Sequence, residues 1–162
     1  MLESTILLAK AVILALPGAW LVTGAYDNFR HPTANLSSVD RVLRMIDVEA
    51  EYPEIWRDYQ KRSVSSPRLV RALFYLIAAS EALVAAWMLI SVGLLIVASF
   101  GGVPTNVAYA MAIGSTAAFT AIWGAFLIGG NWFHYWMPES NPQKTHFFMT
   151  LWGLGTLIVI LP

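Results

Sequence analysis

The chain of 162 residues contains no cysteine, and only 12% of its residues are charged. Without cysteine it can form no disulfide, no thiolate metal site, no iron–sulfur cluster and no covalently attached haem. Ten acidic and ten basic residues leave no basic excess to neutralise phosphates, so a nucleic-acid partner is not expected. No nucleophile–base pair, phosphate-cradling glycine loop or carboxylate cluster is visible, so the sequence does not point to an enzyme.

Apolar residues make up 57% of the chain, and most of them lie in four long runs. A helix rising about 1.5 Å per residue needs about 20 apolar residues to cross a hydrocarbon core of about 30 Å. We therefore predict an all-α membrane protein, a four-transmembrane-helix bundle in which residues 1–162 form a single integral membrane domain. The predicted spans are residues 5–25, 69–98, 107–130 and 146–161. Four spans would place both termini on one side of the membrane.

The polar loop, residues 26–68, carries seven of the ten basic and seven of the ten acidic residues. Ser37 and Asp40 have the spacing of a weak capping box, which predicts that a helix begins there. Apolar residues then recur at helical spacing at Val39, Val42, Leu43 and Ile46. We expect an amphipathic surface helix that lies on the membrane or across the mouth of the bundle.

The last loop opens with a dense run of aromatic residues: Trp132, Phe133, Tyr135 and Trp136. Such rings are typical of the interface where helices leave the membrane, and we expect them to form an aromatic belt. The alternative is a platform for a flat cofactor or a quinone ring. We predict no bound cofactor, and contact with lipid or quinone stays open.

Two segments carry a resemblance to a known family. One is Leu76–Leu83, which places Glu81 within an apolar helix, and the other is Gly129–Trp136, with the pattern Gly-Gly-x-x-Phe-x-x-Trp. Together with the order of spans, they resemble a family of small bacterial integral membrane proteins classed as a domain of unknown function. The resemblance covers nearly the whole chain. It implies four spans in a bacterial inner membrane, and it implies no activity.

The orientation in that membrane is predicted differently by two arguments. The positive-inside rule would place the basic first loop in the cytoplasm. The resemblance implies the opposite, with the N-terminus inside. We follow the resemblance, because the long loop is nearly charge-balanced and Lys10 and the terminal amine are positive charges near the N-terminus.

Glu81 is the outstanding intramembrane residue, since an unpaired charge near the bilayer centre costs at least about 2.5–3.5 kcal/mol. Lys10 on the first span is one potential partner, because the geometry of antiparallel neighbours allows the pair. Hydroxyl groups of Thr23, Ser115 or Thr116 are alternative hydrogen-bond partners. Glu81 would then be either a structural carboxyl or a proton-relay or ligand-binding group.

The three histidines, His31, His134 and His146, are each predicted near the same face of the membrane. Imidazole is a ligand for zinc, copper, iron and haem, so three converging rings could bind a metal. None of them shows local ligand spacing, and solvated interfacial histidines are the simpler interpretation. The identity of any metal stays unknown.

Small residues recur at four-residue spacing in the second and third predicted spans, which favours close helix packing. Ala112 and Thr116 belong to one such row, and we consider it as a lipid-facing seam for docking a foreign helix.

The favoured function is an accessory or assembly subunit that packs against a larger inner-membrane complex, respiratory or photosynthetic, without catalysis of its own. Its expected partners are membrane lipids and that complex, and homo-oligomerisation stays open. One alternative is a small transporter or ligand-binding protein centred on Glu81. The other is a metal- or quinone-associated redox protein that uses the one-sided histidines.

Overall fold

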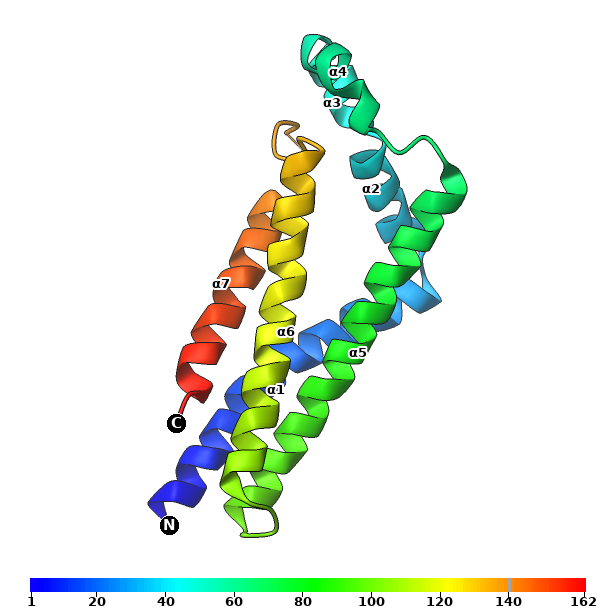
Figure 1. Cartoon of the computed structure of the whole chain (residues 1–162). Coiled ribbons are helices and arrows are strands. Elements are labelled where there is room, and N and C mark those ends of the chain that lie inside the picture. The colour runs from blue at the N-terminus through cyan, green and yellow to red at the C-terminus, as the bar shows by residue number, and fades with distance from the viewer. Residues whose placement is uncertain (140) are drawn as a thin grey trace.

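The computed structural model describes residues 1–139 and 141–162, and every regular element in this part of the chain is helical (Figure 1). The helices are α1 Leu2–Arg30, α2 Thr33–Leu43, α3 Ile46–Glu51, α4 Pro53–Tyr59, α5 Pro67–Ser99, α6 Thr105–Trp132 and α7 Gln143–Ile160, with a 3₁₀ helix η1 at Gln60–Arg62. Three of them, α1, α5 and α6, are long and apolar enough to cross a membrane. The all-α prediction and the first three predicted spans agree with these helices.

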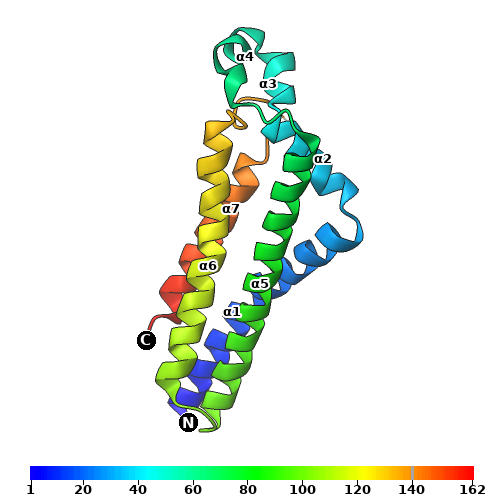
Figure 2. The ribbon, with the colours of Figure 1, turned by 45° about the vertical axis from the view of Figure 1, so that its right-hand side comes forward.

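Helices α5 and α6 form an antiparallel hairpin, and α7 returns along α6 (Figure 1). Helix α1 crosses α5 at an angle, and α2 then continues beside α5, as Figure 2 shows from a second side. In both views α3 and α4 lie beyond one end of the bundle, whereas the N-terminus lies at the other end.

The crossing of α1 over α5 depends on a small residue. A Cβ atom at Gly18 would lie 3.3 Å from Cβ of Met88, which is tighter than ordinary packing. The preceding residue, Pro17, is buried inside α1, where proline removes one backbone hydrogen bond. The sequence of α1 therefore permits a close approach to α5 at this point.

Helix α7 packs on α6 through another glycine. A Cβ atom at Gly153 would overlap Oγ1 of Thr120 and lie 3.0 Å from Cδ1 of Phe119. The helix has 18 residues, or about 27 Å. Of the described helices, α7 is not among the three that meet the length and hydropathy requirement for crossing a membrane.

The loop helix exists, but its bounds differ from the predicted ones. It begins at Thr33, because Pro32 already has helical angles of φ −64° and ψ −20°. The predicted start at Ser37 is therefore wrong, and this residue lies inside α2. Met45 takes the left-handed conformation, with φ 57°, so Ile46 belongs to α3 instead of continuing the apolar face of α2.

The small-residue row of α6 faces the interior. Ala112 and Thr116 are both fully buried, and the Thr116 hydroxyl donates to the Ala112 carbonyl at 2.7 Å. Ala112 belongs to the apolar core together with Ala108 and Phe119. The expectation of a lipid-facing seam at this row is wrong, because its side chains are used for packing within the chain.

Candidate functional site

A pocket of about 430 Å³ lies where α1 and α2 meet α5, α6 and α7. We call it the Glu81 pocket. Its aromatic lining residues are Trp20, Phe74, Trp123, Phe126, Phe133 and Tyr135. Its lining also includes Asn28, Asn35, Glu81 and His146. A mostly apolar cavity of this size with a few converging polar groups is the usual form of a small-molecule site.

A chain of hydrogen bonds crosses one wall of this pocket. Asn35 Nδ2 donates to Asn28 Oδ1 at 2.6 Å, and Asn28 Nδ2 donates to Glu81 Oε2 at 2.7 Å. Asn28 lies in the last turn of α1, and Asn35 lies in the first turn of α2. The sharp turn at His31 and Pro32 brings these two amides together, so the α1–α2 junction orients the carboxyl group of α5.

Glu81 lies near the midpoint of α5 and is 6% exposed. The hydroxyl partners considered from the sequence do not reach it, since each donates to a backbone carbonyl of its own helix. Thr23 donates to Trp20, while Ser115 and Thr116 both donate to Ala112. The side-chain amide of Asn28 donates to Glu81 instead of these hydroxyls.

Lys10 lies away from Glu81 and has other partners. Its ammonium donates to the carbonyls of Ile160 at 3.2 Å and Leu161 at 2.6 Å. It also lies 4.6 Å from the ring centroid of Tyr109 on α6. Lys10 therefore satisfies carbonyls at the end of α7 that have no partner within that helix. The structure does not bring Lys10 and Glu81 together.

Trp123 forms the centre of an aromatic cluster beside Glu81. Its ring meets Trp20 and Phe126 edge to face, each with 5.4 Å between ring centroids. Trp123 is 5% exposed, and among the described residues its indole Nε1 has no hydrogen-bond partner. A buried donor without an acceptor is costly, so Nε1 of Trp123 is an exception among buried polar groups.

His146 lies on the far side of this cluster. Its ring stacks on Tyr135 with 5.7 Å between centroids, and its Nδ1 lies 3.3 Å from the Tyr135 hydroxyl. Burial raises the pKa of Tyr135 to about 12, so the phenol stays neutral near pH 7. The ring of Tyr135 lies directly over Gly130, where a Cβ atom would overlap it. The second glycine of the Gly129–Trp136 segment, Gly130, thus makes room for this stack.

The other two histidines belong to different surroundings. His31 ends α1 and is exposed, whereas His134 lies 4.4 Å from the ring of Tyr59. Among the described residues no group of three or more His, Asp or Glu side chains is placed to hold a metal ion. The structure therefore does not bring the three candidate histidines together, because His146 turns toward the Glu81 pocket.

The aromatic residues after α6 divide into two sets. Trp132 and Trp136 are exposed, as expected for an interfacial belt. Phe133 and Tyr135 instead line pockets. The guanidinium of Arg62 lies 4.3 Å from the Trp132 ring and donates to the Trp132 carbonyl at 3.1 Å, which ties the long loop to the end of α6.

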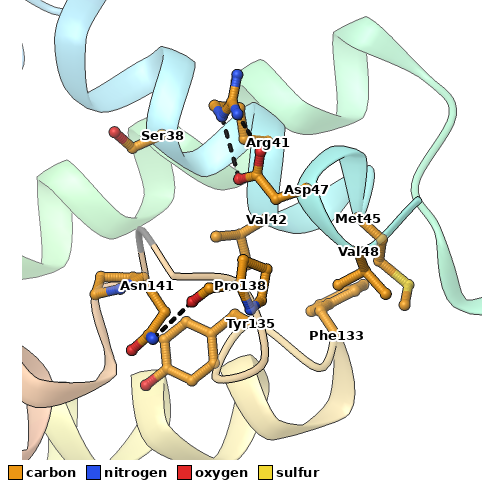
Figure 3. A pocket seen from close by; sticks show the side chains of 11 residues that line it. Ser38, Arg41, Val42, Met45, Asp47, Val48, Phe133, Tyr135, Pro138 and Asn141 are labelled. Atoms are coloured by element: carbon orange, nitrogen blue, oxygen red, sulfur yellow. Dashed lines mark hydrogen bonds and ion pairs between the residues drawn. The ribbon is translucent and has the colours of Figure 1, made fainter. Parts of the chain in front are cut away.

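A second pocket of about 270 Å³ adjoins the first (Figure 3). The two share Ser38, Val42, Phe133, Tyr135 and Pro142. On the α2 side, Arg41 Nε donates to Asp47 Oδ2 at 3.1 Å. The shared wall is formed by α2 and by residues of the connection between α6 and α7.

Sequence reasoning singled out Glu81 and His146 but missed Asn28, Asn35 and Trp123 as parts of one site. The sequence contains only a weak signal for these residues. Two asparagines seven residues apart follow the first apolar run, and asparagine is common at helix ends for purely local reasons.

Comparison with known proteins gives a family but no characterised relative. No curated protein and no solved structure matches the chain. One family model matches, over residues 6–162, and the family is described as "predicted small integral membrane protein". This match confirms the resemblance seen in Leu76–Leu83 and Gly129–Trp136. The chain therefore belongs to this family of small integral membrane proteins, DUF2165, a domain of unknown function.

Proposed function

We propose that this protein binds a lipophilic small molecule in the Glu81 pocket. The observation that carries the proposal is the hydrogen-bonded chain Asn35–Asn28–Glu81, with Asn28 and Glu81 buried, on the wall of a pocket of about 430 Å³. The carboxyl group of Glu81 supplies a directional contact, and the aromatic rings supply apolar surface. This is the ligand-binding alternative centred on Glu81.

The accessory-subunit prediction rests on the absence of clustered polar groups in the sequence, because ligand binding requires such groups. The Glu81 pocket supplies such a cluster, so the main argument against ligand binding no longer applies. A role as an accessory or assembly subunit of a larger respiratory or photosynthetic complex stays a prediction. The redox alternative has less support, because the three histidines do not share one site.

We also propose four crossings of a bacterial inner membrane, with α7 as the fourth span. Its length of about 27 Å approaches the thickness of the hydrocarbon core. The contact of Lys10 with Ile160 and Leu161 supports this topology, because it pairs an early turn of α1 with the end of α7. An even number of crossings returns the chain to the side where it began.

Photolabelling of the full-length protein in lipid nanodiscs tests the proposed pocket. A small lipophilic diazirine should label residues that line the pocket, such as Trp123 and Phe126, as located by peptide mass spectrometry. The variant Gly129→Phe should abolish this labelling, because Gly129 lines the pocket and a side chain there meets open space.

The matched control is Gly93→Phe, which lies in α5 away from the pocket and also meets open space. It should label as the wild type does. Labelling confined to lipid-exposed residues such as Leu83 and Ile128, and unchanged by Gly129→Phe, would contradict the proposal.

A further inference from the structure

Resting on the proposed ligand-binding function, we infer that the Glu81 pocket selects a lipophilic organic cation, with Glu81 as its counter-ion and the aromatic rings as its cage. Three features of the pocket carry this inference: an acid without a cationic partner among the described residues, a lining that includes neither lysine nor arginine among those residues, and aromatic walls set at steep angles to one another.

The acid has no cationic partner. Glu81 is 6% exposed and accepts one hydrogen bond, from Asn28 at 2.7 Å. The ion pairs within the described residues, Arg41–Asp47 and Arg44–Asp40, both lie in the extramembrane loop. A buried carboxylate is stable only when a positive charge or several hydrogen bonds compensate it. A bound cation would supply that missing charge.

The residues that line the pocket favour a positively charged ligand. Among the described residues that line it, Glu81 is the acid and no lysine or arginine is present. An anionic or zwitterionic ligand would therefore place its negative charge near a carboxyl group, with His146 as the one basic side chain among the described lining residues. Lys10, a basic residue of α1, already donates to carbonyls at the end of α7.

The aromatic walls are suited to a cation. The ring of Trp123 is inclined by 66° to the ring of Trp20 and by 80° to the ring of Phe126. The three rings therefore form an angled wall. The faces of such rings carry negative potential and attract organic cations, most strongly where water is excluded.

Two probes of similar shape and opposite charge test this inference. Tetraphenylphosphonium and tetraphenylborate are to be measured at mildly alkaline pH on full-length protein in zwitterionic nanodiscs, with binding to empty nanodiscs subtracted. The wild type should bind the phosphonium saturably and the borate no better than empty nanodiscs do. Glu81→Gln should weaken phosphonium binding by about tenfold or more.

Two control variants accompany this measurement. Glu81→Asp keeps the charge and should retain part of the affinity, whereas Asp58→Asn removes an exposed acid of α4 and should bind as the wild type does. Glu81→Gln keeps an oxygen that can accept from Asn28, and its thermal unfolding shows whether the fold is intact.

Equal binding of both probes, phosphonium binding that Glu81→Gln leaves unchanged, or no saturable binding of the phosphonium would each overturn the inference. The proposed function fails separately, when the diazirine label in the pocket is absent or is unaffected by Gly129→Phe.

Discussion

Asn28 is the residue on which the site depends most directly. It donates to Glu81 with its amide nitrogen and accepts from Asn35 with its amide oxygen, so both hydrogen bonds of the Asn35–Asn28–Glu81 chain involve this one side chain. It is also 6% exposed, which means that water cannot readily replace it. Removing a buried partner costs more than the hydrogen bond itself contributes, because the group left behind stays desolvated.

We predict that Asn28→Ala lowers the free energy of unfolding by about 1–3 kcal/mol, since Glu81 then loses its donor. Asn35→Ala is the matched comparison and should cost less, about 0.5–1.5 kcal/mol, because Asn35 is exposed. Thermal or denaturant unfolding in detergent measures both. The double variant should cost less than the sum of the single ones, because the three residues act as one network. Equal effects of the two single variants would contradict this account.

At the scale of elements, glycines decide how closely helices pack. The rows of small residues visible in the sequence do not distinguish an internal contact from a docking surface. Only the burial of these residues distinguishes the two, and Ala112 and Thr116 are buried within the chain. Gly153 and Gly155 illustrate the same difference within one helix, because a Cβ atom at Gly153 meets α6 and one at Gly155 meets open space.

We predict that Gly153→Leu destabilises the protein by about 1–3 kcal/mol, the usual cost of forcing extra atoms into a packed interface. Gly155→Leu should change the unfolding temperature little, because its side chain has room. Thermal unfolding of both variants in the same detergent provides the measurement. If Gly155→Leu were the more damaging of the two, the packing of α7 on α6 described here would be wrong.

At the scale of the whole molecule, the main question is the number of crossings. Helices α1, α5 and α6 satisfy the length and hydropathy requirement for a span, whereas α7 is not among them. Lys10 donates to the Ile160 carbonyl at the end of α7, across 150 residues of sequence. Four crossings and an inside N-terminus together predict which side of the membrane each segment occupies.

Reporter fusions in a bacterial host test that topology. Green fluorescent protein fused after Pro162 should fluoresce, because the C-terminus is predicted in the cytoplasm. Alkaline phosphatase fused within residues 26–68 should be active, because this loop is predicted outside. An active phosphatase after Pro162 with an active one in the loop would indicate three crossings. Phosphatase activity at residues 100–106 and after Pro162, but not within residues 26–68, would indicate the opposite orientation.

The sequence by itself determined the class of the molecule, the positions of α1, α5 and α6, and the presence of Glu81 in an apolar helix. These are local properties, set by the length and composition of about 20 consecutive residues.

Only the tertiary structure decided which polar groups meet. Asn28 and Glu81 are 53 residues apart in the chain, and their contact depends on how α1 crosses α5 and where Pro32 starts α2. The partners proposed from the sequence, Lys10 and the three hydroxyls, were compatible with the same hydrophobic pattern. Crossing angles and helix rotations arise from side-chain packing between distant segments, and no local pattern encodes them. The Glu81 pocket is therefore a product of packing, although each of its residues is visible in the sequence.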